Sequence, residues 1–463
     1  MSDEKIKGVW WRADAPDKKL QGEITYSPTS GATVDIFGHI YEEFDDKTQT
    51  KRFTLHGLTL RNKAVSLFDC AVANSRIHIP GGRSCIIKSV FGVVGAHFHE
   101  PSEIRFKKVF VNYNGLRDWT WTSGIQTTYE EKPRRAIFTY QVPDDAEVGQ
   151  FGDLSGKLSY SSTTSLGGAT LSIKEDCQLI IDAVGLTTYA PFENLFHTFQ
   201  HFLSLALQRP VYAVQIIGRI DVPREVIEGH ELYEEFLIIR KLSIKDWDRE
   251  ELIPDDLLFT LPELGAPLRK VFGTFFSQHE RLKPSLDLYL STVYNPEQSS
   301  RVEFLTLAQG LEGYHRVSMA GKYIDDAAYQ SGLQQILTAA IPAEIDPGFR
   351  TSLRNKLKYL HEFSLRKRIE GLAQRHASIV GNLLGSPRDF GSLVSELRNQ
   401  LTHPDSSSGS GVIDYKRLWH LSEKMALLLE VCFLDDLGFQ HDRIRQIVNS
   451  RSQRARRIHF ASF

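Results

Sequence analysis

The sequence predicts an α+β protein in which an antiparallel, β-sandwich-like domain is followed by an all-α helix bundle. As far as about residue 185, short runs of alternating apolar and polar residues are separated by glycine and proline turns, as at 80–82 and 167–168. This pattern is typical of antiparallel strands. After Ser300 the apolar residues instead recur every three or four positions, which is the period of a helix.

The strands and the domain limits follow from these patterns. The polar, turn-forming run at 295–300 marks the clearest boundary in the chain. Strands are expected at 33–38, 108–113, 135–140, 169–173 and 177–181. We expect three parts: a β-rich domain at 1–190, a mixed α/β connector at 191–300 and a helical domain at 301–463.

Five helices are expected in the last part. The first has an apolar face formed by Phe304, Leu307, Leu311 and Tyr314. The other four are expected at 325–341, 349–376, 390–401 and 412–437. The fifth has the strongest apolar stripe, which is formed by Leu418, Leu421, Met425, Leu428 and Cys432. Helices with such faces bury them by packing as a bundle.

Composition excludes several classes of protein. Of the 463 residues, 41% are hydrophobic and 24% are charged, as is typical of globular proteins. The sequence has no apolar run long enough to span a bilayer and no apolar signal segment at its charged start. The four cysteines lie far apart, which favours reduced thiols over disulfides or a cysteine zinc site. We therefore expect a cytoplasmic protein that does not enter a membrane.

The formal charge of −2 hides an asymmetry between the two ends of the chain. Residues 301–463 contain 22 Lys/Arg and 17 Asp/Glu, whereas the preceding part has 33 and 40. A basic carboxyl-terminal part fits a polyanionic partner such as a nucleic acid. The sequence contains no phosphate-binding loop, serine-nucleophile elbow or HExxH zinc motif.

The stretch before Pro404 carries the most specific chemical signal. The apolar stripe within 390–401 predicts a helix, and Arg398, Asn399 and His403 lie off that stripe. Pro404 disfavours helical geometry at His403, so the imidazole should lie near the helix end. A guanidinium stabilises charge on phosphoryl oxygens, an amide holds them, and an imidazole transfers a proton near neutral pH. The alternative interpretation is an exposed helix end that is capped by a histidine.

This motif resembles that of a known family. Arg398 and Asn399, followed after three residues by His403, resemble the motif of HEPN (higher eukaryotes and prokaryotes nucleotide-binding) ribonucleases. The helix at 303–316 resembles the first HEPN helix of ApeA-type proteins, which are bacterial anti-phage proteins that end in a HEPN domain. The start of the chain resembles the amino-terminal domain of these proteins. The resemblance lies in Gly8-Val9-Trp10-Trp11, the segment 20–26, Gly31 and Gly38.

The resemblance implies a function. It implies a metal-independent endoribonuclease without a cofactor, which cleaves cellular RNA, most plausibly tRNA, through attack by the 2′-hydroxyl group and arrests growth during abortive infection. HEPN bundles pair to form one composite site. A homodimer or a dimer of dimers is therefore implied, with Arg398, Asn399 and His403 as the catalytic residues. The resemblance also assigns the β-rich domain a sensing or regulatory role that responds to a phage-derived trigger.

Basic residues of the expected third helix form a candidate RNA-binding surface. Residues 346–376 contain eight Lys/Arg against three Asp/Glu, and a solvated helix face is the alternative interpretation. The expected RNA-binding residues are Arg354, Lys358, Arg366, Lys367 and Arg368. Arg354 and His361 also fit a relaxed HEPN spacing, but no helix terminator follows them, so we favour Arg398 and His403 as the catalytic pair.

Other polar groups have two interpretations each. Glu312 and His315 are candidate cleft residues, although Glu312 and Arg316 are four apart and are more simply a surface pair. The pair His97 and His99, and the group Glu193, His197 and His201, have spacings that suit a metal ion. A solvated strand edge and a satisfied helix face explain them better, so no metal site is expected.

Two other functions stay open at the level of the sequence. A degenerate HEPN scaffold would bind nucleic acid or protein without cleaving it. Nucleotidyl transfer onto protein or RNA is known of HEPN relatives that act with a partner enzyme, and no such partner can be identified from one chain.

Overall fold

The computed structural model divides into two compact units, one formed mainly by residues 1–273 and the other mainly by 274–463. Helix α4 (Leu268–Tyr294) runs across this division. No described helix is both long and apolar enough to cross a bilayer. The structure describes residues 5–41, 51–77, 81–131, 135–168, 170–227, 230–242, 256–402, 414–450 and 452–460.

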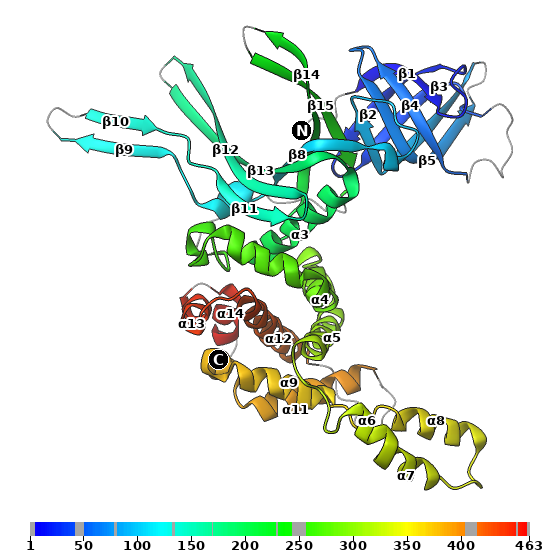
Figure 1. Cartoon of the computed structure of the whole chain (residues 1–463), viewed down its shortest axis with the longest axis vertical. Coiled ribbons are helices and arrows are strands. Elements are labelled where there is room, and N and C mark those ends of the chain that lie inside the picture. The colour runs from blue at the N-terminus through cyan, green and yellow to red at the C-terminus, as the bar shows by residue number, and fades with distance from the viewer. Residues whose placement is uncertain are drawn as a thin grey trace. The chain divides into compact units, whose positions relative to one another are not determined.

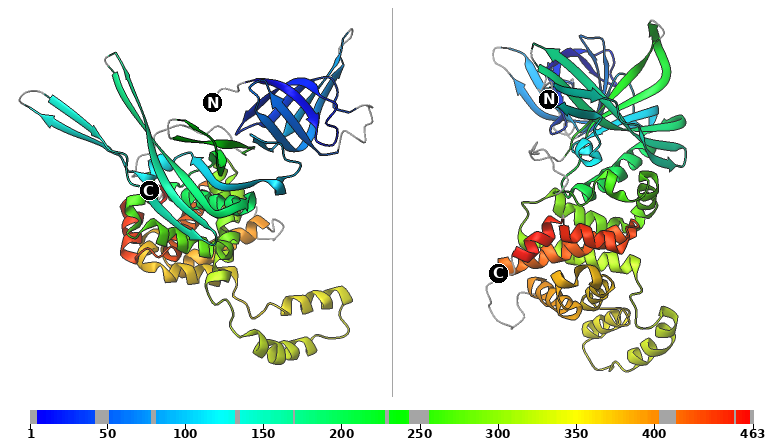
Figure 2. Two further views of the ribbon diagram at one scale, coloured as in Figure 1. Left: turned by 45° about the horizontal axis from the view of Figure 1, so that its top comes forward. Right: turned by 90° about the vertical axis from the view of Figure 1, so that its left-hand side faces the viewer.

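Six of the described strands close into an antiparallel barrel, coloured blue in Figures 1 and 2. Their order is β5-β4-β1-β2-β3-β6, and the additional pairing of β5 with β6 closes the ring. The strands are β1 (Ile6–Arg12), β2 (Leu20–Ser27), β3 (Gly31–Phe37), β4 (Phe53–Thr59), β5 (Ala64–Ile77) and β6 (Arg83–Ser89).

The barrel core explains the tryptophan and glycine pattern near the start of the chain. Trp10 on β1 is fully buried together with Val34, Leu55 and Ile87 from other barrel strands. A Cβ atom at Gly57 on β4 would lie 2.2 Å from the Trp10 ring. Only glycine therefore leaves room for the indole that fills the barrel.

The sheet continues beyond the barrel in the order β11-β12-β13-β8-β14-β15-β7-β5, while β9 and β10 form a separate hairpin. The predicted antiparallel, β-rich amino-terminal class is confirmed, and it takes the form of a barrel with further strands. The added elements are η1 (Pro101–Glu103), α2 (Leu116–Thr120), η3 (Leu261–Leu264), β7 (Phe91–Val94), β8 (Arg105–Tyr113), β9 (Ile125–Glu130), β10 (Arg135–Tyr140), β11 (Ala146–Phe151), β12 (Leu154–Gly167), β13 (Thr170–Thr188), β14 (Ala213–Ile227) and β15 (His230–Arg240).

Helix α3 (Tyr189–Leu207) packs on this second part of the sheet, against β8 and β13. Its buried face is aromatic, because Phe192, Phe196, Phe199 and Phe202 are all inaccessible to solvent. The Phe199 and Phe202 rings meet the Phe272 ring of α4 at centroid distances of 5.1 and 5.5 Å. The first turns of α4 thereby belong to the amino-terminal unit.

The second unit is helical, which confirms the predicted class of the carboxyl-terminal part. Its predicted apolar stripes are buried, including Phe304 on α5 and Leu418 on α12. Helix α12 contacts α5, α9, α10, α13 and α14, and it is therefore the central helix. The helices after α4 are α5 (Ser300–Ser318), α6 (Asp326–Ala328), η4 (Tyr329–Leu333), α7 (Gln334–Ala339), α8 (Pro347–Leu357), α9 (Leu365–Arg375), α10 (Ala377–Leu384), α11 (Pro387–Thr402), α12 (Tyr415–Asp436), α13 (His441–Ser450) and α14 (Gln453–Phe460).

The single long helix expected at 349–376 is wrong, because the structure has two helices, α8 and α9, in its place. The segment between them pairs with a distant segment: Tyr323 donates its amide to the His361 carbonyl, and Phe363 donates to the Gly321 carbonyl, both at 2.8 Å. These backbone groups therefore form hydrogen bonds with a segment that is distant in the sequence, and they do not form the hydrogen bonds of a continuous helix. Ser364 then caps the new helix by accepting from the Lys367 amide.

Candidate functional site

Helix α11 positions the Arg398–Asn399 pair. Its apolar side chains Phe390, Val394 and Leu401 are buried. The neighbouring helix α9 lies so close that a Cβ atom at Gly391 would meet the Arg366 carbonyl oxygen at 2.7 Å. The motif helix is therefore firmly held on one side, while its opposite side faces solvent.

Arg398 and Asn399 lie on that open side. Arg398 is half-buried and Asn399 is exposed. The Arg398 guanidinium donates a hydrogen bond to the Asn399 side-chain oxygen at 3.3 Å. This contact between neutral and cationic groups leaves most of the guanidinium donors for another acceptor. Helix α11 extends to Thr402, and His403 lies outside the described residues.

Arg301 lies at the same helix end and was missed by the sequence reasoning. Its guanidinium donates to the carbonyl oxygen of Leu401, from the first turn of α5, which Ser299 caps. A second cation therefore lies at the carboxyl end of α11, where carbonyl groups lack helical donors. Arg301 precedes the motif by about one hundred residues, so no local spacing could have identified it.

The candidate cleft residues Glu312 and His315 lie in an ion-pair network. Arg316 donates to Glu312 at 3.0 Å and to Glu362 at 2.7 Å. His315 is 1% exposed, and its Nδ1 atom accepts from Arg368 at 3.2 Å. Burial, together with the Arg368 and Arg316 charges, lowers the pKa of His315 to about 4. The geometry favours a neutral, structural histidine and the simpler surface pair for Glu312.

The basic residues of α8 and α9 separate into two groups. Arg368 is 2% exposed and pairs with Glu362 at 3.2 Å, so its guanidinium is a core group that is not available to RNA phosphates. Arg354, Lys358 and Arg366 are exposed, and Lys367 is half-buried. These four side chains keep the accessibility that the expected RNA-binding role requires.

His361, the alternative motif histidine, is also a core group. It is 6% exposed, its Nε2 atom donates to Asp326 Oδ1 at 2.6 Å, and its ring stacks on Tyr329 at 4.2 Å. Burial and these partners remove it from solvent, which leaves Arg398 and Asn399 as the accessible match to the motif.

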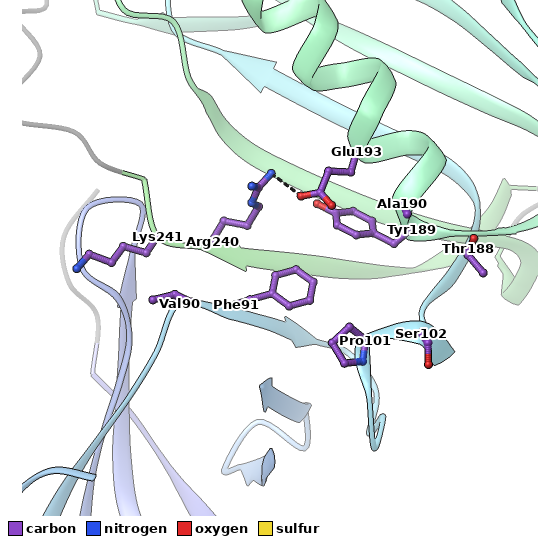
Figure 3. A pocket seen from close by; sticks show the side chains of 10 residues that line it. All are labelled: Val90, Phe91, Pro101, Ser102, Thr188, Tyr189, Ala190, Glu193, Arg240 and Lys241. Atoms are coloured by element: carbon purple, nitrogen blue, oxygen red, sulfur yellow. Dashed lines mark ion pairs between the residues drawn. The ribbon is translucent and has the colours of Figure 1, made fainter. Parts of the chain in front are cut away.

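Glu193, which shares a helix face with His197, lines a depression of about 560 Å³ in the amino-terminal unit. Figure 3 shows its floor, formed by Phe91 and Tyr189, and the Glu193–Arg240 ion pair at 3.2 Å. Arg240 also donates to His197 Nε2 at 2.6 Å. The ring nitrogen that would bind a metal ion is thus already an acceptor, which supports the satisfied-face interpretation. An apolar floor beside opposite charges suits a ligand with both apolar and polar groups.

Comparison with known proteins identifies both ends of the chain. The family model described as ApeA N-terminal domain 1 matches residues 5–275, more than half of the chain. The model described as Apea-like HEPN matches residues 305–443, which include Arg398, Asn399 and His403. No curated protein and no solved structure matches the chain significantly.

Proposed function

We propose that this chain, which belongs to the ApeA-type family and carries an Apea-like HEPN domain, is a metal-independent endoribonuclease of bacterial anti-phage defence. The observation that carries the proposal is the accessible Arg398–Asn399 pair at the end of α11, immediately before His403. The pair supplies phosphate-binding groups, and the imidazole supplies a group that exchanges a proton near neutral pH.

The proposed reaction is an internal transesterification. One His403 takes the proton from a ribose 2′-hydroxyl, whose oxygen forms a bond to the adjacent phosphorus. The bond from phosphorus to the 5′-oxygen breaks, and a second imidazole protonates that oxygen. Arg398 stabilises the charge on the phosphoryl oxygens, and Asn399 orients them. The products are a 2′,3′-cyclic phosphate and a 5′-hydroxyl, and no water is consumed.

The reaction requires a base and an acid on opposite sides of the phosphorus, whereas one motif contains a single histidine. Two-fold pairing supplies the second imidazole, because an isologous interface brings the same patch of two copies together. We therefore propose a homodimer or a dimer of dimers. Exposed apolar side chains between α5 and α9 support pairing of this unit. They are Tyr323, Leu333, Ile336, Phe349, Tyr359 and Leu360.

The substrate class and the regulation follow the family. Cellular RNA, with tRNA as the best candidate, would approach along the exposed Arg354, Lys358 and Arg366 and the half-buried Lys367, which offer phosphate contacts. The amino-terminal domain would sense a phage-derived trigger in the cytoplasm. The depression beside Tyr189 and the Glu193–Arg240 pair gives that domain a place to bind one.

Incubation of the purified protein with total RNA in excess EDTA tests the proposed function. Cleavage that persists in EDTA and leaves cyclic phosphate ends is the expected result, because no step uses a metal ion. Binding without cleavage, with or without trigger-containing phage lysate, would contradict the enzyme and favour a binding module.

A further inference from the structure

Three side chains meet at one end of the helical unit, and one of them is distant in the sequence from the other two. They are His376, between α9 and α10, Asp435 in the last turn of α12, and His441 at the start of α13. One ligand-type atom from each lies within 4.8 Å of the other two. Two imidazoles and a carboxylate are a ligand set that is typical of zinc.

The two ring nitrogens of His376 make no hydrogen bond within the described part of the chain. Its side chain is 0% exposed, and neither Nδ1 nor Nε2 has a hydrogen-bond partner among the described residues. A buried polar group without a partner is rare and costly. The most buried of the three side chains, His376, therefore lacks a hydrogen-bond partner among the described residues.

The two oxygens of Asp435 have different partners, and the longer contact, a hydrogen bond between Oδ1 and His441 Nε2, is the one that an ion would replace. Arg375 Nη2 holds Asp435 Oδ2 at 2.7 Å, while Asp435 Oδ1 lies 3.3 Å from His441 Nε2. In a tetrahedral zinc site with bonds near 2.0 Å, neighbouring ligand atoms are roughly 3.3 Å apart. The carboxylate and the second imidazole thus already have the spacing of two zinc ligands, and an outer guanidinium fixes the carboxylate as an outer-sphere partner does.

The set is also accessible to an ion. His441 is half-exposed, and His441 and Asp435 line a depression of about 500 Å³ together with Phe439 and Asp442. The Arg375 charge opposes a cation, whereas the Asp435 and Asp442 carboxylates attract it. An ion held here would face that depression, which leaves room for water as a fourth ligand.

We propose that His376, Asp435 and His441 bind one Zn²⁺ ion. The ion would link the junction of α9 and α10 to the end of α12 and the start of α13, and so would fasten the helical unit. This role is structural. It is separate from the Arg398–Asn399 pair, and it does not depend on the proposed ribonuclease activity.

Zinc binding by the full-length protein tests the proposal. The protein is stripped with a chelator, desalted and titrated with ZnCl₂ alone, while bound zinc is counted by mass spectrometry. One zinc per chain and a rise in Tm of several degrees are expected for the wild type. His441→Ala should weaken binding by at least about 100-fold and make Tm insensitive to zinc, because a ligand is lost from an exposed position that the fold does not need.

Two neighbouring carboxylates provide the matched control. Asp435→Asn should abolish binding, whereas Asp442→Asn removes the same charge from an exposed group and should keep the stoichiometry of one. Circular dichroism confirms that each variant is folded. Wild-type protein that binds no zinc above the level of the His441→Ala variant would overturn the proposal, and so would equal losses in the two aspartate variants.

Discussion

Arg398 occupies the position at which a single charge should matter most. Arg398→Ala is expected to lower the cleavage rate by about 10²–10³-fold, because one preorganised donor to the phosphoryl oxygens is lost. Its half-buried guanidinium forms no ion pair with any residue that the structure describes, so Tm should change little. Cleavage of labelled RNA under single-turnover conditions measures the effect.

Arg388→Ala is the matched control, since Arg388 is an exposed arginine near the other end of α11. It should cleave RNA at the wild-type rate. Equal losses in Arg388→Ala and Arg398→Ala would point to general electrostatic attraction and would remove Arg398 from the chemistry.

His315 makes a prediction about pH. The unfolded histidine takes up a proton near pH 6.5, whereas burial lowers the folded pKa to about 4. The unfolded state therefore binds more protons between these values, and the free energy of unfolding should fall as pH decreases from about 6.5 to 4, by roughly 3 kcal/mol from this group. His315→Asn, which keeps an acceptor for Arg368, should flatten this slope in urea unfolding while RNA cleavage persists.

A cleavage defect in folded His315→Asn at neutral pH would contradict the structural role. Such a defect would indicate that His315 acts in the catalytic cleft.

Local spacing predicted the accessibility of single residues, whereas their catalytic role stays a prediction. Arg398 and Asn399 lie off the apolar stripe and are accessible, as the spacing requires. It did not separate Arg368 from Arg366 and Lys367, because charge alone does not tell which arginine has a buried partner. That partner, Glu362, lies on a turn whose position depends on pairing with residues 321–323.

At the scale of helices, α9 carries basic side chains that reach solvent, Arg366 and Lys367, and one that is buried, Arg368. Arg366→Gln combined with Lys367→Gln should weaken RNA binding and reduce the slope of log K against log salt by up to about 2, because fewer counterions are released. The fold should be unaffected, since both side chains reach solvent. Binding measured from 50 to 300 mM salt tests this.

Arg368→Gln is the contrasting variant on the same helix. It should destabilise the protein by on the order of 3 kcal/mol, because the buried guanidinium loses its hydrogen bonds to the Phe363 carbonyl, His315 and Glu362. A double variant with an unchanged salt slope would show that the exposed side of α9 is only a solvated face.

The carboxyl-terminal helix α14 makes a further prediction. Arg454 on this basic helix is only 9% exposed. It donates to Glu430 at 2.5 Å and pairs with Glu423 at 3.3 Å, and Tyr289 donates to the same Glu430 at 2.7 Å. Arg454→Met should cost about 3–5 kcal/mol in urea unfolding, because a buried carboxylate is left unpaired. Wild-type stability in Arg454→Met would contradict docking of this helix.

Element boundaries were the hardest feature to predict. The apolar stripes predicted where α5, α11 and α12 lie in the sequence, because the apolar side chains of each stripe are buried in the core. Helix α4 continues through Pro284, with Leu282 and Leu286 buried on either side. Tertiary burial there outweighs the hydrogen bond that proline removes.

For the whole molecule, composition and periodicity predicted an antiparallel β-rich part and a helical part, and both are confirmed. Closure of the barrel was not predictable, because the β5–β6 pairing depends on registers between distant strands. The zinc ligand set was likewise hidden, since His376 and Asp435 are brought together only by the packing of α10 against α12.

The central claim is that two copies of the motif act on one phosphate. The direct measurement is RNA cleavage in EDTA by wild-type chains that have exchanged subunits with a fourfold excess of His403→Ala chains, with exchange verified by a mixed-tag pull-down. If mixed pairs are inactive, activity should fall to about 4% of that of an equal total amount of wild type, because only pairs of two wild-type chains keep both proton carriers. A fall to about 20%, as simple dilution gives, or an active monomer in light scattering, would contradict the composite site.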